Sequence, residues 1–246
     1  QTCALPICGL LRDHLHEGSP VTVDEAITYA IQLCDALAYC HDQGIVHRDL
    51  KPDNIMIGRD GRIRLIDFGA SLLEGAPRIT TSSISPALGT PDYMSPEQVQ
   101  GKRGDVRSDV YALGAMLYEL LTGYPPYRGD TALAVMAQHV QSSPPPFRAR
   151  VRGVPAALEA ITFKAMRRNP DARYQSMGAM RSDLTRVGTL DATSIWAEAP
   201  NEGPGSPVAG GPGPGQKAPI WVPWTIAALA VAVAVAALGA VVALER

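Results

Sequence analysis

The chain has 246 residues, a net charge of −2 and four cysteines. This length accommodates one domain of medium size and a tail, and the near-neutral charge gives no reason to expect nucleic-acid binding. Four cysteines are too few for a disulfide scaffold, so we expect Cys34 and Cys40 to be buried free thiols in a reducing compartment.

Residues 1–7, "QTCALPI", lack the charged start and the apolar run of a signal peptide. The stretch can be encoded by DNA that resembles a short-read sequencing adapter. We therefore expect residues 1–7 to be an assembly artefact where the gene was truncated. An ordinary disordered terminus is the alternative.

A long helix is predicted between Thr22 and Gly44. Thr22 and Glu25 form a T-x-x-E capping box, and Gly44 stands where a helix would stop. The apolar residues recur at helical spacing, at Ile27, Ala30, Ile31, Cys34, Leu37 and Ala38. We expect this helix to support the short strand "GIV" (44–46) that follows it.

The next stretch is "HRDLKPDN" (47–54), which leads into "IMIGRDGRIRLIDFGA" (55–70). Two short apolar runs separated by the turn signal "GRDGR" predict a strand hairpin. Taken alone, residues 47–54 would suit a charged surface loop. The hairpin and the "DFG" (67–69) that follow favour a catalytic interpretation.

The residue types suit phosphoryl transfer to an alcohol. That reaction needs a carboxylate to accept the hydroxyl proton, a cation near the moving phosphate and oxygen ligands for Mg²⁺. Asp49 is the candidate base and Lys51 the candidate cation. Asn54 and Asp67 are the candidate metal ligands, because one amide and one carboxylate suffice when phosphates and water complete the shell.

These motifs resemble the catalytic and metal-binding loops of eukaryotic-type protein kinases. Three later segments extend the resemblance over roughly residues 9–187: "GTPDYMSPEQ" (89–98), "RSDVYALGAMLYELLTGYPPY" (107–127) and "NPDARY" (169–174). The resemblance implies an α+β, protein-kinase-like fold whose mainly helical C-terminal lobe occupies residues 8–190. It also implies ATP and Mg²⁺ as cofactors and proteins as substrates.

The resemblance further assigns roles around the catalytic loop. His47, Phe68 and Gly69 would be structural. Arg48 would pair with a phosphate on the activation segment, and this charge-assisted contact would order that segment. The candidate phosphorylation sites are Thr80, Thr81, Ser82, Ser83 and Ser85, and an unmodified polar loop is the alternative.

Two positions indicate the substrate class. Lys51-Pro52 and Gly89-Thr90 resemble the members that phosphorylate serine or threonine. Thr90 would then lie close to Asp49 and the acceptor hydroxyl. Alternatively, Thr90 only starts a turn before Pro91.

Three further residues carry structural roles in the family. Asp109 would be a buried acid that holds the catalytic-loop backbone, although an acid at a helix N-terminus is also favoured by the dipole. Glu97 and Arg173 resemble the ion pair that ties the activation segment to the late helices. The sequence leaves the burial of this pair open.

The N-terminal lobe is not found in this sequence. Residues from Cys8 resemble the short helix after the kinase hinge, and no glycine-rich loop, strand lysine or helix glutamate precedes them. We expect the chain as given to be an incomplete kinase that binds ATP poorly.

After residue 190 the composition changes. Residues 191–219 are predicted to be a Pro/Gly-rich juxtamembrane linker, and residues 220–244 contain no charge. At about 1.5 Å per residue, a helix of this length exceeds the roughly 30 Å hydrocarbon core, so we expect one transmembrane helix. Trp221 and Trp224 suit the membrane interface, and a buried core helix is the alternative.

The layout resembles bacterial receptor-like serine/threonine kinases. It implies a single-pass protein of the cell membrane with its kinase domain in the cytoplasm, active on proteins and able to form homodimers. The alternatives are a membrane-tethered pseudokinase scaffold and a small-molecule phosphotransferase of related fold. The segments 89–98 and 169–174 favour the protein kinase over the latter.

Overall fold

The computed structural model describes residues 7–68, 72–73 and 91–197. The chain divides into two units, Gln1–Val208 and Ala209–Arg246, and the second lies outside the described residues. The described helices are α1 (Val23–Asp42), α2 (Pro96–Val99), α3 (Val106–Thr122), α4 (Ala132–Gln141), α5 (Ala156–Ala165), α6 (Met177–Leu184) and α7 (Ala192–Ala197). The strands are β1 (Ile7–Leu10), β2 (Ile45–Val46), β3 (Ile55–Gly58), β4 (Ile63–Leu65) and β5 (Leu72–Leu73). Short 3₁₀ turns are η1 (Leu11–His14), η2 (Pro52–Asn54), η3 (Pro91–Tyr93), η4 (Phe147–Ala149) and η5 (Pro170–Ala172).

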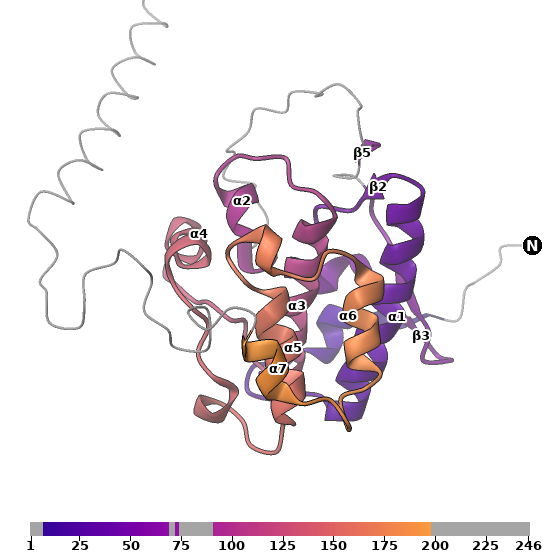
Figure 1. Ribbon diagram of the computed structural model, residues 1–246. Helices are drawn as coiled ribbons and strands as arrows, with labels where there is room; N and C mark the ends of the chain where they lie inside the picture. The colour runs from indigo at the N-terminus through magenta and orange to yellow at the C-terminus, as the bar shows by residue number, and fades with distance from the viewer. Residues whose placement is uncertain (1–6, 69–71, 74–90, 198–246) are drawn as a thin grey trace, which may run out of the picture. The chain divides into compact units, whose positions relative to one another are not determined.

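Helix α3 forms the centre of the lobe. It is apolar around most of its circumference, so it must be surrounded on all sides, and every residue from Ser108 to Thr122 is buried. Helices α1 and α5 pack against it, and α6 packs against both of these helices (Figure 1). Asp105 caps its N-terminus by accepting from the backbone N–H of Arg107, and Gly123 ends it in the left-handed conformation with φ 73°.

Helix α1 confirms the predicted helix. Thr22 accepts a hydrogen bond from the backbone N–H of Glu25, and the Glu25 carboxylate accepts from Thr22, which completes the capping box. The prediction that Cys34 and Cys40 are buried free thiols is confirmed for Cys34 and only partly for Cys40. Cys34 is fully buried, whereas Cys40 is only partly buried; both are free thiols.

The predicted hairpin is confirmed as β3 and β4, which pair antiparallel around a tight turn. Strand β1 adds to the other side of β3, and β2 pairs with β5. The sequence predicted a short helix from Cys8, but residues 7–10 form β1 and the helical turn begins only at Leu11. The extended conformation is decided by pairing with β3, which is 48 residues away at Gly9↔Ile57.

Helix α7 corrects the predicted linker, which was placed from residue 191. Ile195 of α7 is buried, and the ring of Trp196 lies 5.9 Å from that of Phe163 in α5. The folded lobe therefore extends to Ala197. The six residues of α7 are too few to show a helical period in the sequence, so this helix is recognised only from its packing on α5.

Several predictions fall outside the described residues. They concern Gly69, Thr90, the five candidate phosphorylation sites and the segment 220–244. Among the helices that the structure does describe, none combines the length and the apolar character needed to cross a membrane.

Candidate active site

The catalytic-loop candidates lie together after β2. The Asp49 carboxylate is 44% exposed and accepts a bond from Lys51 Nζ at 2.8 Å. The side-chain amide of Asn54 donates to the backbone oxygen of Asp49 at 2.8 Å and to its Oδ2 at 3.2 Å. Asp49 is thus fixed from two sides and still open to solvent, as a base that receives a proton from a second molecule must be.

The metal-ligand candidates meet through the backbone. Ile66 donates its N–H to the carbonyl of Asn54 at 2.9 Å, which brings Asp67 next to η2. Because the Asn54 amide nitrogen is used on Asp49, its Oδ1 is the atom left to coordinate a cation. Asp67 is exposed and holds a left-handed backbone with φ 59°. One carboxylate and one amide oxygen suit Mg²⁺ that keeps phosphate and water ligands.

Arg48 is the second non-glycine residue with a left-handed backbone among the described residues, with φ 64°. Such strain persists where surrounding groups fix both sides of the peptide. The N–H of Arg48 donates to Asp109 Oδ1 at 2.8 Å, and its carbonyl accepts from Gln98 Nε2 at 2.8 Å. Its guanidinium Nε lies 3.4 Å from the carbonyl oxygen of Gly104.

Asp109 anchors the start of the catalytic loop. It is 1% exposed and accepts from the backbone N–H groups of His47, at 2.9 Å, and Arg48. The imidazole of His41, at the end of α1, lies 2.8 Å from Asp109 Oδ2. Neither His41 nor Gln98 was predicted from the sequence. The only sequence signal for His41 was its place shortly before β2 and the loop 47–54.

His47 and Phe68 join the two motif loops. Their ring centroids are 5.0 Å apart, and His47 is fully buried while Phe68 is 41% exposed. Burial lowers the pKa of His47, since it disfavours the charged imidazole. His47 is thus a neutral ring on which Phe68 packs. This contact helps to position Asp67, the residue before Phe68.

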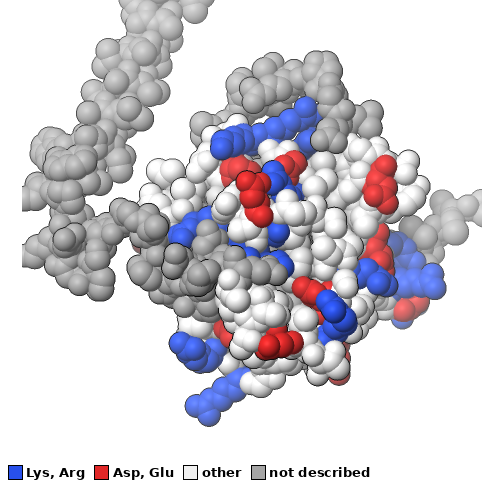
Figure 2. Space-filling view, in the orientation of Figure 1, with Lys and Arg blue, Asp and Glu red and all other residues white. Residues whose placement is uncertain are grey.

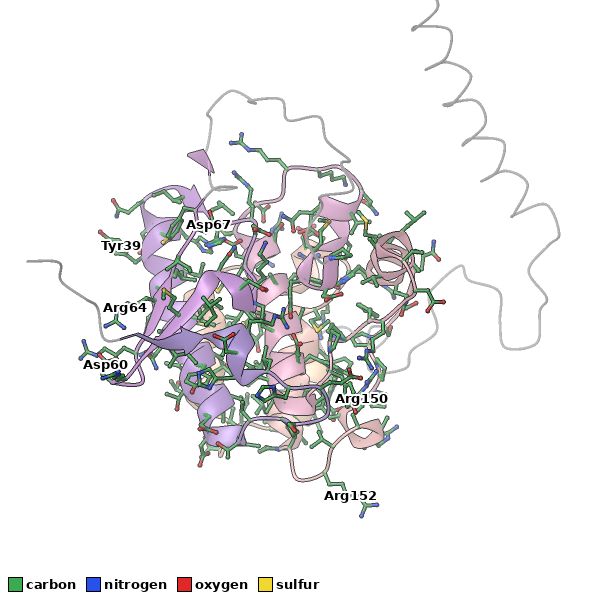
Figure 3. All side chains as sticks on the ribbon, turned by 180° about the vertical axis from the view of Figure 1, so that it is seen from behind. Tyr39, Asp60, Arg64, Asp67, Arg150 and Arg152 are labelled. Carbon is green, nitrogen blue, oxygen red and sulfur yellow. The ribbon has the colours of Figure 1, made fainter. Side chains whose placement is uncertain are left out.

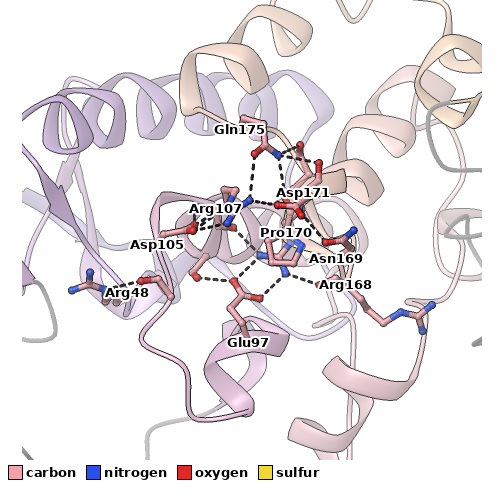
Figure 4. A network of polar contacts seen from close by, with 12 residues as sticks. Arg48, Glu97, Asp105, Arg107, Arg168, Asn169, Pro170, Asp171 and Gln175 are labelled. Carbon is pink, nitrogen blue, oxygen red and sulfur yellow. Dashed lines mark hydrogen bonds and ion pairs between the residues drawn. The ribbon is translucent and has the colours of Figure 1, made fainter. Parts of the chain in front are cut away.

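Glu97 and Arg173 form a buried bidentate ion pair (Figure 4). The two guanidinium nitrogens lie 2.7 and 2.8 Å from the two Glu97 oxygens, and the hydroxyl of Ser108 donates to Glu97 at 2.7 Å. Arg173 has 0% side-chain exposure and also donates to the carbonyls of Arg107 and Arg168. Burial opposes ionisation of Glu97, but Arg173 and Ser108 overcome it and lower its pKa to about 2.

A second polar cluster, which was not predicted from the sequence, lies beside the catalytic loop. The guanidinium of Arg12 donates to Tyr93 at 2.8 Å, to Glu119 at 3.2 Å and to Asp53 at 3.3 Å. Tyr93 in turn donates to Glu119. Burial, and then the charge of Glu119, raise the pKa of Asp92 to about 6. These contacts fix η1 and η3 against the end of α3.

Comparison with known proteins decides the family. Residues 5–184 match the protein kinase domain family. The chain belongs to the protein kinase family. The kinase motifs at residues 47–54, 67–69 and 169–174 all fall within the matched range.

Bacterial relatives are similar over the same region. Serine/threonine-protein kinase PknB of Mycobacterium tuberculosis is 44% identical over 177 residues, which is 72% of this chain and 28% of the relative. PknB of Mycolicibacterium smegmatis is 43% identical over 177 residues, with the same coverage. A relative from Corynebacterium efficiens, named as a serine/threonine-protein kinase, is 41% identical over 202 residues, 80% of this chain and 30% of the relative. The chain thus spans less than a third of the length of these kinases.

Proposed function

We propose that this chain is the large lobe of a membrane-anchored serine/threonine protein kinase. The observation that carries the proposal is the geometry of Asp49, a half-exposed carboxylate held by Lys51 at 2.8 Å and by the Asn54 amide. The relatives of this chain are named as serine/threonine-protein kinases, and this supports the proposed activity.

In the proposed reaction Asp49 orients the acceptor hydroxyl and takes its proton as the oxygen attacks. Lys51 has two successive roles. It neutralises Asp49 in the resting site and then places its ammonium near the transferring phosphate, where positive charge stabilises the transition state. Asn54 keeps the carboxylate in place through its bond to the Asp49 backbone when Lys51 turns away.

ATP would supply the phosphoryl group and Mg²⁺ would neutralise its charge. Asn54 Oδ1 and the Asp67 carboxylate are the residues of this chain that would hold the metal. The left-handed backbone of Asp67 and the packing of its neighbour Phe68 on His47 favour one fixed position for that carboxylate.

Serine and threonine are the proposed acceptors, on the basis of Lys51-Pro52 and Thr90. We further propose that Arg48 pairs with a phosphate on the activation segment, where Thr80, Thr81, Ser82, Ser83 and Ser85 are the candidate acceptors. The N–H and the carbonyl of Arg48 are already bonded to Asp109 and Gln98. A contact between Arg48 and a phosphate would therefore cost little conformational entropy in the Arg48 backbone.

The membrane part of the proposal rests on residues 220–244. This segment has no charged residue, and Trp221 and Trp224 stand at its start. We place the kinase side in the cytoplasm, where ATP and free thiols are found. Extraction of membranes at alkaline pH tests the anchor, because a spanning chain stays in the pellet and a peripheral one is released.

The decisive experiment measures phosphate incorporation by the complete gene product. Its reading frame is established first by a long genomic read across the codons for residues 1–12. Asp49→Asn should remove nearly all transfer and leave the fold intact, because the amide cannot accept the proton. Asp60→Asn in the exposed β3–β4 turn is the matched control, since it makes the same chemical change outside the site. Equal incorporation by wild type and Asp49→Asn would refute the assignment, and wild-type protein that binds partners without any transfer would favour the scaffold.

A further inference from the structure

Three arginines project from the segment 147–153 at the edge of the lobe. Arg148 and Arg152 are exposed and Arg150 is half-buried, and we refer to these three as the arginine loop. Figure 2 shows basic side chains at the lower edge of the lobe, with acidic side chains near them, and Arg152 points away from the ribbon in Figure 3. Within the described part of the chain none of the three forms an ion pair, whereas most other arginines do.

The arginine loop is held in a fixed conformation. The backbone N–H of Phe147 donates to the Glu159 carboxylate at 2.8 Å, and the N–H groups of Arg150 and Val151 both donate to the Phe147 carbonyl. The Arg150 guanidinium lies 5.0 Å from the ring centroid of Tyr124. Because these contacts order the loop in advance, binding through it would cost little conformational entropy.

Helix α7, the last described helix, packs near this loop. Trp196, next to the last residue of α7, packs on Phe163, and Phe163 lies 5.8 Å from Phe147 at the start of the loop. Residues 198–219 then separate α7 from the apolar segment 220–244. An anchor in the segment 220–244 would hold the whole lobe at the bilayer, so the arginine loop would meet lipid headgroups at a high effective concentration.

The loop also lies away from the catalytic residues. Helix α3 runs between them, with Asp109 holding the catalytic loop in its first turn and Tyr118 packing on Phe147 near its other end. In Figure 3, Asp67 and Arg152 are well separated across the lobe. A surface that rests on the arginine loop would therefore leave Asp49 open to protein substrates.

We propose that the arginine loop, Arg148, Arg150 and Arg152, is a docking surface for the anionic phospholipid headgroups of the membrane that anchors this kinase. The inference rests on the proposed anchoring by residues 220–244. Each arginine near an anionic surface strengthens binding about fivefold, so the three together should favour the docked orientation about a hundredfold. The effect should weaken with salt, since the contact is electrostatic.

The test uses the complete chain in nanodiscs of phosphatidylcholine, with or without phosphatidylserine. Hydrogen exchange of residues 147–153 is compared between the two lipid mixtures. We expect phosphatidylserine to slow it by up to about a hundredfold, with the slowing lost at high salt. The variant Arg148→Gln/Arg150→Gln/Arg152→Gln should lose the slowing while α3 remains as protected as in wild type.

The matched control is Arg59→Gln/Arg62→Gln/Arg181→Gln, which removes the same charge from exposed arginines elsewhere on the lobe. It should keep the slowing. Equal exchange with and without phosphatidylserine would overturn the proposal, and so would equal slowing in both triple variants. Slowing by soluble polyglutamate in phosphatidylcholine nanodiscs would overturn the lipid assignment in favour of an acidic protein partner.

Failure of the anchor has a different signature. A chain without a membrane anchor would be released by alkaline extraction and would not co-purify with the nanodiscs. The arginine loop is then tested on the soluble chain with phosphatidylserine vesicles. Unchanged exchange of residues 147–153 in that case would overturn the lipid surface as well.

Discussion

The carboxylate of Asp109 accepts a hydrogen bond of 2.8 Å from the backbone N–H of Arg48, whose φ of 64° lies in the left-handed region. A buried acid on the central helix thus holds a strained peptide next to Asp49, the proposed catalytic base. An unfavourable backbone of this kind costs about 1–3 kcal/mol, so the bond sustains a conformation that the loop would not keep alone.

Replacing Asp109 by Ala should therefore destabilise the lobe and the catalytic loop together. It leaves the buried N–H groups of His47 and Arg48 without their acceptor, and we expect a loss of about 3 kcal/mol in the free energy of unfolding. Chemical denaturation measures it, with Asp24→Ala in the exposed first turn of α1 as the control. An Asp109→Ala protein as stable as that control would contradict the anchoring role.

The Glu97–Arg173 pair should behave as a buried ion pair. Arg173→Ala leaves the Glu97 carboxylate buried without its partner, and we expect the free energy of unfolding to fall by about 3–5 kcal/mol. The comparison is Arg181→Ala, which breaks the exposed pair between Arg181 and Asp35 at 2.6 Å and should cost less than about 1 kcal/mol. Similar losses in both variants would show that burial does not set the cost.

His139 should make the stability depend on pH. It is fully buried beside Tyr111, at 2.7 Å between the hydroxyl and Nδ1, and burial lowers its pKa to about 4. In the unfolded chain it protonates near pH 6.5, so stability is complete above that pH and falls as the pH drops towards 4. The loss should reach about 3 kcal/mol.

Asp92 should change the free energy of unfolding in the opposite direction over the same pH range. Variants of the two residues separate their contributions. Its pKa of about 6 means that its carboxylate is a cost above that pH, which is relieved on acidification. Urea denaturation between pH 7 and 4 should show a flatter profile for His139→Gln and a steeper one for Asp92→Asn. A His139→Gln profile parallel to that of wild type would contradict a neutral buried His139.

Helix α7 should contribute to the stability of the lobe. Ile195 is 3% exposed, and its carbonyl accepts from the buried guanidinium of Arg167 at 2.9 Å. We expect Ile195→Ala to cost about 2–4 kcal/mol, because it leaves a cavity. Leu133→Ala, at a residue that is 73% exposed, should change stability by less than about 0.5 kcal/mol. Thermal unfolding compares the two, and equal midpoints would place the end of the lobe before α7.

The sequence by itself determined the features that depend on neighbours along the chain. The capping box of α1, the β3–β4 hairpin and the group of Asp49, Lys51 and Asn54 all join residues no more than about ten positions apart, where backbone geometry leaves few alternatives.

The tertiary structure decided the contacts between residues far apart in the chain. Arg12 meets Glu119 across 107 positions, and Gln98 meets the Arg48 carbonyl across 50. No local pattern encodes such contacts, nor the packing of Trp196 on Phe163 that makes α7 part of the lobe. They form because α3 must bury its whole circumference, and the helices and loops that cover it carry these side chains to one another.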